Sequence, residues 1–276
     1  MSDSGIDTEV ADPARRYDYW LGGKDNFAGD RASGEEIARI FPGIRRTVLA
    51  NRAFLGRAVH HLALKRGVRQ FLDIGTGLPT ADNLHEIAQR VDPACRVVYV
   101  DNNRVVLAHA RAILTSTTPH GITAYVEADL RDPATILKQA SKTLDFTKPI
   151  ALNLAAVLHF IADAEDPYRI VADLTEALPK GSYLLLSHGT TDGMDPKTIA
   201  RLAARKTPDS TKETLRSRDQ VNAFFTGTRL LRPGLVRADR WMPDPGAETG
   251  AGGCGELIAV WAGVAQIRPH HTRRTA

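Results

Sequence analysis

Three aspartates lie at equal spacing, each at or just after the end of a predicted strand. Asp73, Asp101 and Asp129 follow one another at intervals of 28 residues, about the length of one strand and one helix. In a doubly wound sheet the carboxyl ends of neighbouring strands line one crevice, where the three carboxylates would meet. Asp101 can accept hydrogen bonds from a ribose diol, Asp129 from an adenine amino group, and Asp73 can pair with an ammonium. Aspartates near strand ends also form turns and caps, but the shared register favours binding.

A glycine turn directly follows the first of these aspartates. Gly75 and Gly77 can adopt positive φ and carry no Cβ, so a ligand can lie against the backbone. A dinucleotide-binding turn would have its third glycine where Thr80 stands, and a carboxylate at Asp73 is unfavourable beside a pyrophosphate. It is favourable beside an ammonium. S-adenosylmethionine has an ammonium and a sulfonium and no phosphate, so the turn, including Thr76, favours S-adenosylmethionine as the cofactor.

A histidine follows the fourth predicted strand. The loop from Asn153 to Phe160 would run past the sulfonium, where a methyl acceptor must lie. His159 is therefore the candidate catalytic residue and part of the acceptor pocket, because an ordinary histidine pKa lies near neutrality. The alternative is that His159 only positions the loop or packs beneath the ligand. His188, after the fifth strand, has the same two interpretations.

The N-terminal segment 15–27 combines aromatic residues, a pair of glycines and a polar cluster. This composition is consistent with a lid that folds over the cofactor and forms one wall of the acceptor pocket. It is equally consistent with an arm whose aromatic side chains cover the core. The lid hypothesis predicts pocket residues at Tyr17, Tyr19, Lys24, Asp25 and Asn26.

The elements that would position these residues alternate along the chain. Strands are predicted at Gln70–Asp73, Arg96–Val100, Ile122–Glu127, Ile150–Leu154 and Tyr183–Leu186, with helices between them. The first of these helices should begin at Pro79, which suits the first helical position, and end near Val91. Asn51 and Arg52 fall in a preceding helix, at positions that are more often solvated than ligand-binding unless that helix rims the pocket. Two final runs, Leu235–Trp241 and Glu256–Val264, predict an antiparallel hairpin. The fold class is α/β with a mostly parallel sheet.

Composition limits the function classes. The chain has 276 residues, 43% hydrophobic and 25% charged, with a formal charge of +4 and no long basic stripe, which argues against nucleic acid as a partner. Its two cysteines form neither a disulfide framework nor a metal site. No apolar segment could act as a secretion signal or a membrane span. We expect a cytoplasmic protein that binds no metal ion and no membrane, and the sequence does not indicate its oligomeric state.

Longer strings of residues resemble a known family. The matching strings are residues 16–27, 51–55, 70–80, 98–102, 128–133, 157–160 and 182–188. They are similar to a bacterial family of S-adenosylmethionine-dependent methyltransferase-like proteins, long catalogued as a domain of unknown function. The resemblance implies a class I, Rossmann-like fold of seven strands with a C-terminal antiparallel hairpin and an N-terminal helical cap. By the same similarity, the predicted cofactor contacts are Asp73, Gly75, Thr76, Gly77, Asp101, Asn102, Ala128, Asp129, Leu130 and Asn153.

The predicted organisation is a disordered tail at 1–14, a helical cap or lid at 15–67, a cofactor-binding domain at 68–265 and a basic tail at 266–276. The predicted function is methyl transfer from S-adenosylmethionine to an unidentified small molecule. Asn153 stands where many amino-methylating enzymes have an acidic residue, which disfavours a nucleobase or glutamine nitrogen as acceptor. A non-catalytic S-adenosylmethionine-binding protein is the alternative. An NAD-dependent oxidoreductase is disfavoured by Asp73, Thr80 and the terminal hairpin.

Overall fold

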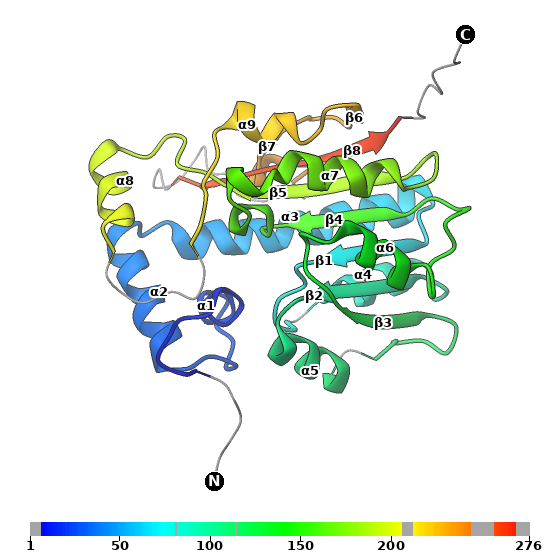
Figure 1. The fold of residues 1–276 in the computed structure, drawn as a ribbon, viewed down its shortest axis with the longest axis horizontal. Coiled ribbons are helices and arrows are strands. Elements are labelled where there is room, and N and C mark those ends of the chain that lie inside the picture. The colour runs from blue at the N-terminus through cyan, green and yellow to red at the C-terminus, as the bar shows by residue number, and fades with distance from the viewer. Residues whose placement is uncertain (1–6, 81, 114, 206–211, 244–256, 269–276) are drawn as a thin grey trace.

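A central sheet of five parallel strands is extended at one side by three strands that are joined to it and to one another by antiparallel pairing (Figure 1). The computed structural model describes residues 7–80, 82–113, 115–205, 212–243 and 257–268. Within them the sheet has the order β3-β2-β1-β4-β5-β8-β6, and β7 pairs with β8. The strands are β1 (Gln70–Ile74), β2 (Arg96–Asp101), β3 (Ile122–Glu127), β4 (Ala151–Ala155), β5 (Tyr183–Gly189), β6 (Thr228–Leu230), β7 (Val236–Arg237) and β8 (Val260–Ile267).

Helices cover both faces of the sheet (Figure 1). They are α1 (Pro13–Trp20), α2 (Ala28–Ile40), α3 (Ile44–Arg66), α4 (Leu84–Val91), α5 (Arg104–Ile113), α6 (Pro133–Ala140), α7 (Pro167–Glu176), α8 (Pro196–Ala203) and α9 (Arg218–Ala223). Successive strand residues point to opposite faces, so Phe71 belongs to the buried cluster that includes α3 and α4, whereas Leu72 belongs to the cluster that includes α6, α7 and α9. No described helix has both the length and the apolar character needed to cross a membrane. The cytoplasmic location stays a prediction.

The strand register places the site. Asp73 on β1 lies opposite Asn153 on β4, because these two strands pair in parallel. Asp101 is the last residue of β2, opposite Glu127. The carboxyl ends of these strands therefore meet at one edge of the sheet, as the equal spacing of the aspartates predicted.

The helix after the glycine turn begins later than predicted. α4 starts at Leu84, five residues beyond the predicted start at Pro79. Asn83 Oδ1 accepts from the Thr80 N–H at 3.1 Å, which joins the helix start to the preceding turn. Asn83 is the N-cap residue, and Glu86 Oε2 accepts from its N–H at 2.6 Å. This pair is a capping box, and it determines the first helical turn more strongly than the proline does.

The C-terminal strands differ from a simple hairpin. The antiparallel pairing is confirmed, but β8 lies between β5 and β6 and pairs with three strands. Of the predicted strand Leu235–Trp241 only Val236–Arg237 is a strand, and Ala238–Arg240 is a 3-10 turn. The short β6, which was not predicted, raises the count to eight. Residues 244–256, which include most of the predicted connection, lie outside the described part of the chain.

The predicted tail at 1–14 is wrong over residues 7–14. Asp12 caps α1, accepting from the Ala14 N–H at 2.9 Å and the Arg15 N–H at 3.2 Å, and Ala11 is fully buried. Arg15 forms a buried ion pair with Asp30 of α2 at 2.7 Å. An acidic, small-residue segment looks disordered by composition, but here the Asp12 carboxylate caps α1, and the Asp12 N–H donates to Asp30 of α2 at 2.8 Å.

Candidate active site

A cavity of about 840 Å³ opens at the carboxyl ends of the parallel strands. The helices α1 and α2 lie beyond this edge, and α8 lies beside α2 (Figure 1). Every predicted cofactor residue lines the cavity, namely Asp73, Gly75, Thr76, Gly77, Asp101, Asn102, Ala128, Asp129, Leu130 and Asn153. The sequence prediction of which side chains come together is therefore correct for this set.

Asp73 lies at the base of the cavity in a hydrogen-bonded pair. Asn153 Nδ2 donates to Asp73 Oδ1, and burial raises the pKa of the Asp73 carboxyl to about 6. The Asn153 bond and the charge of Arg52 oppose this rise in pKa, and the charge of Asp101 adds to it. The side chain of Asn153 is only 2% exposed, and its Oδ1 has no hydrogen-bond partner in the described structure. The pair presents a carboxylate and a free amide oxygen, both hydrogen-bond acceptors.

Glycine is favoured at positions 75 and 77 for different structural reasons. Both have positive φ, 73° at Gly75 and 67° at Gly77. A Cβ on Gly75 would come within 2.3 Å of Val157 Cγ2, whereas a Cβ on Gly77 would meet nothing within 4 Å. The prediction that ligand space explains both glycines is thus wrong for Gly75, where the Val157 side chain takes the room. At Gly77 the backbone faces open space in the cavity.

Two further carboxylates lie along the sheet edge. Asp101 Oδ2 accepts from the Gly77 N–H at 3.1 Å and Oδ1 from the Asn103 N–H at 2.9 Å, while burial raises its pKa. Partial burial also raises the pKa of Asp129, but hydrogen bonds from the Arg131 N–H and from Asn102 lower it by more, so the pKa of Asp129 is lowered overall. Asn102 Nδ2 donates to Asp129 Oδ2 at 2.9 Å. Keeping Asp101 ionised in the folded protein therefore costs more free energy than keeping Asp129 ionised.

His159 lines the cavity but is not suited to act as a general base. Burial lowers its pKa to about 3, and the positive charges of Arg16 and Arg216 add to this effect. A group that binds a proton only near pH 3 is a weak proton acceptor at neutral pH. Its Nδ1 has no partner in the described structure, so a neutral imidazole faces the cavity. His188 instead has both ring nitrogens engaged, by Gly189 O at 2.7 Å and Arg216 Nη1 at 2.9 Å.

The predicted lid residues separate into two groups. Tyr17 lines the cavity, whereas Tyr19, Lys24, Asp25 and Asn26 do not. The Asp25 N–H and Asn26 Nδ2 both donate to Asp18 Oδ2, at 3.0 and 2.9 Å. A Cβ on Gly23 would come 1.9 Å from Asp18 Oδ1, so that glycine permits close packing of the loop.

Tyr19 points away from the cavity, toward Glu35 and Arg45. The helix α1 itself, and not the loop after it, therefore forms the N-terminal wall of the cavity. The polar cluster at 24–26 folds back on Asp18 and organises this loop.

Asn51 was not among the predicted site residues. It lies on α3, is only 4% exposed and lines the cavity, so α3 rims the pocket, which is the exception that the sequence left open. A signal was present in the sequence. Asn51 falls on the same helical face as Val48, Leu55 and Val59, where a polar residue needs a reason to be buried.

The side of the cavity away from the sheet edge is mostly apolar. Trp20, Ile37 and Val48 form a buried cluster here, with Ile44 and Leu202 packed against it. All five line the cavity. Arg16 crosses this wall and bonds to Ser33 at 3.1 Å and Glu213 at 2.5 Å, which joins α1 to the segment before α9.

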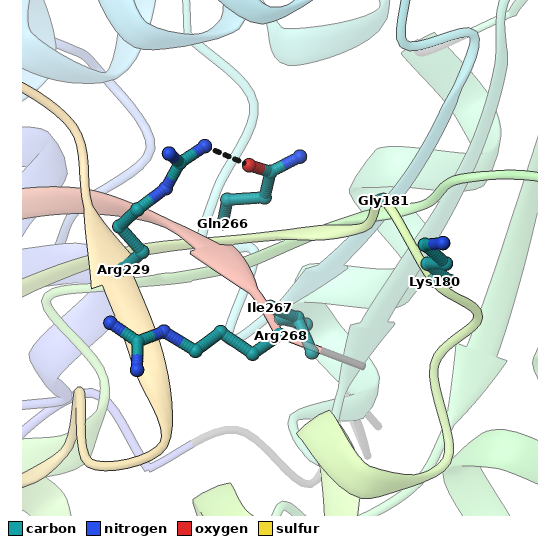
Figure 2. A pocket seen from close by; sticks show the side chains of 6 residues that line it. All are labelled: Lys180, Gly181, Arg229, Gln266, Ile267 and Arg268. Atoms are coloured by element: carbon teal, nitrogen blue, oxygen red, sulfur yellow. Dashed lines mark hydrogen bonds between the residues drawn. The ribbon is translucent and has the colours of Figure 1, made fainter. Parts of the chain in front are cut away.

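A second cavity of about 440 Å³ lies near the start of β5 and the end of β8. Figure 2 shows Arg229 bonded to Gln266, with Lys180 apart from Arg229 and Arg268. This position is at the opposite ends of the parallel strands from Asp73, since Lys180 precedes β5. None of the predicted site residues lines this second cavity.

Comparison with known proteins decides the family. A family model described as S-adenosyl methyltransferase matches residues 1–268. The chain belongs to this family. The structure of a DUF574 family protein from Streptomyces avermitilis is 46% identical, with a TM-score of 0.86 over 95% of this chain and 99% of that one. A proposed methyltransferase from Thermobifida fusca is 34% identical, with a TM-score of 0.85 over 98% and 99%. No curated protein sequence matches the chain.

Membership in this methyltransferase family confirms the predicted class I fold and identifies S-adenosylmethionine as the cofactor. The residues present fit that cofactor. Asp73 and the unpartnered Oδ1 of Asn153 are acceptors for an ammonium, and Asp101 is an acceptor for hydroxyls. The open space beside Gly77 lets a ligand approach the backbone.

Proposed function

We propose that this methyltransferase acts on a small, largely apolar acceptor. The observation that carries the proposal is that one cavity holds both the cofactor residues and the apolar wall of Trp20, Ile37 and Val48. Its volume of about 840 Å³ is near the upper end of the roughly 300–1,000 Å³ of small-molecule sites, which leaves room for an acceptor beside the cofactor. When bound, S-adenosylmethionine supplies an electrophilic methyl group on its sulfonium.

The proposed cofactor contacts follow the geometry of the sheet edge. Asp73 and Asn153 would bind the ammonium, and Asp101 the ribose hydroxyls. The adenine would lie among Asn102, Ala128, Asp129 and Leu130, while the backbone of Gly75, Thr76 and Gly77 passes beneath the ligand. Each assignment rests on the position of the residue in the cavity and on the hydrogen-bonding capacity of its side chain.

The helical wall would exclude water from the methyl group. α1 contributes Tyr17 and Trp20, and the bond between Arg16 and Glu213 ties α1 to a segment far along the chain. Exclusion of water strengthens electrostatic interactions within a site and prevents side reactions.

Hydrogen exchange tests this role of α1. We expect amides of residues 14–21 to gain protection when S-adenosylhomocysteine is added, because α1 lines the cavity. Amides of residues 22–26 should change little, since this loop is bonded to Asp18 and lies off the cavity. Added protection in the loop alone, without any in α1, would contradict this assignment of the wall.

His159 is proposed to bind the acceptor as a neutral hydrogen-bonding group and not to remove its proton. Nuclear magnetic resonance of the imidazole nitrogens should show a neutral ring from pH 8 down to pH 5, because the His159 pKa is lowered to about 3. A ring that titrates between pH 6 and 7 would restore it as a candidate base.

Methyl-labelled S-adenosylmethionine tests the function directly. The protein would be incubated separately with the small-molecule and macromolecular fractions of a bacterial extract. We expect S-adenosylhomocysteine and labelled product in the small-molecule fraction. Label confined to macromolecules would refute a small acceptor. Cofactor binding without turnover in any fraction would favour the alternative of a non-catalytic S-adenosylmethionine-binding protein.

A further inference from the structure

The amide of Asn51 has a defined orientation that leaves its oxygen without a partner. Asn51 Nδ2 donates to the Tyr17 hydroxyl at 3.0 Å, and that hydroxyl donates its single proton to Val48 O at 3.3 Å. Since Tyr17 can only accept from Asn51, the amide nitrogen must face Tyr17. The Oδ1 atom is then buried without a partner in the described structure, in a residue that lines the cavity.

An unsatisfied acceptor at this depth is costly unless a ligand supplies a donor. A buried polar group that is left unpaired loses its hydrogen bonds to water without replacing them, which destabilises the folded state. Asn153 Oδ1 is in the same situation, in the same cavity, beside the Asp73 carboxylate. α3, which carries Asn51, packs against β4, which carries Asn153, and against α1, which carries Tyr17.

The three groups together match one kind of ligand. A carboxylate and two amide oxygens are acceptors only, and a primary ammonium has three N–H donors. We propose that Asn51 is the third acceptor for the α-ammonium of S-adenosylmethionine, alongside Asp73 and Asn153, and that Tyr17 holds its amide in place. α1 and α3 thereby take part in recognising the methionine end of the cofactor. The inference rests on cofactor binding in this cavity and is independent of the proposed acceptor.

Calorimetry with two ligands tests the proposal. S-Adenosylhomocysteine carries the α-ammonium, whereas 5′-methylthioadenosine shares the adenine and ribose but lacks the amino acid end. For Asn51→Leu we expect the affinity for S-adenosylhomocysteine to fall about 10- to 100-fold, as for loss of a hydrogen bond to a charged group. The affinity for 5′-methylthioadenosine should change little, because this ligand lacks the ammonium that Asn51 is proposed to bind.

Two further variants separate binding from folding. Asn51→Asp keeps an acceptor oxygen at this position and should retain most of the affinity for S-adenosylhomocysteine. Tyr17→Phe keeps the ring but removes the hydroxyl, and it should weaken S-adenosylhomocysteine selectively by a smaller factor than Asn51→Leu. The proposal is overturned if Asn51→Leu lowers the affinity for both ligands equally, or for neither of them. It is also overturned if Asn51→Asp loses as much affinity for S-adenosylhomocysteine as Asn51→Leu. None of these readouts depends on turnover, so a failure to find an acceptor leaves the test intact.

Discussion

Replacing Asp73 by asparagine is expected to make the ligand-free protein more stable and to weaken its binding of S-adenosylmethionine. Burial raises the pKa of Asp73 from 3.8 to about 6, so ionising this carboxyl above pH 6 costs folding free energy. A shift of about two pKa units corresponds to about 3 kcal/mol, which is an upper bound on the gain at pH 7.5. The gain should shrink as the pH falls from 6 toward 4, because the wild-type carboxyl is then protonated.

The same substitution removes the charge that would pair with the ammonium, and we expect about a 10- to 100-fold loss of S-adenosylmethionine affinity. Chemical denaturation at pH 5 and pH 7.5, with calorimetry, measures the two effects. Asp129→Asn is the matched control, because the Asp129 pKa is lowered in the folded protein and its neutralisation should destabilise. An Asp73→Asn protein that is less stable than wild type at pH 7.5 would contradict this account of the buried carboxylate.

Replacing Asp101 by alanine should weaken S-adenosylmethionine binding by about 1.5–3 kcal/mol, the range for hydrogen bonds to a charged group. Asp101 also accepts from the Gly77 and Asn103 N–H groups, so its loss loosens the glycine turn as well. The loss should therefore extend to 5′-methylthioadenosine, which keeps the ribose, in contrast to the loss expected for Asn51→Leu.

Asp129→Ala provides the comparison for Asp101→Ala, measured by calorimetry with both ligands. Asp129 is partly exposed and already engaged by Asn102 and Arg131, so its removal should cost less affinity than that of Asp101. Unchanged affinity in the Asp101→Ala protein would remove Asp101 from the cofactor site.

The cofactor side of the site could be predicted from the sequence because it depends on local patterns. Strand and helix alternate with a regular period, so the carboxyl ends of the parallel strands had to meet, and Asp73, Asp101 and Asp129 with them. Predicted strand bounds agree closely with β1, β2 and β3 for the same reason. Position along a strand determines the neighbours of a residue, as in the pairing of Asp73 with Asn153.

The features of the site that could not be predicted from the sequence depend on contacts between segments that lie far apart in the chain. Nothing local to Gly75 shows that Val157 fills the space where a Cβ on this residue would lie. The cluster at 24–26 looked like ligand-binding chemistry but serves Asp18, a contact that only the folded loop reveals. The lowered pKa of His159 likewise comes from burial and from Arg16 and Arg216, which are distant in sequence.

The central claim is that S-adenosylmethionine binds at the sheet edge with its amino acid end at Asp73 and its transferable group toward the apolar wall. A crystal structure of the protein with S-adenosylhomocysteine tests this most directly. We predict that the ammonium lies within hydrogen-bonding distance of Asp73 and the ribose at Asp101. The sulfur should face the apolar wall formed by Trp20, Ile37 and Val48. A ligand bound with its ribose away from Asp101, or with its sulfur facing away from the apolar wall, would contradict this mode of cofactor binding.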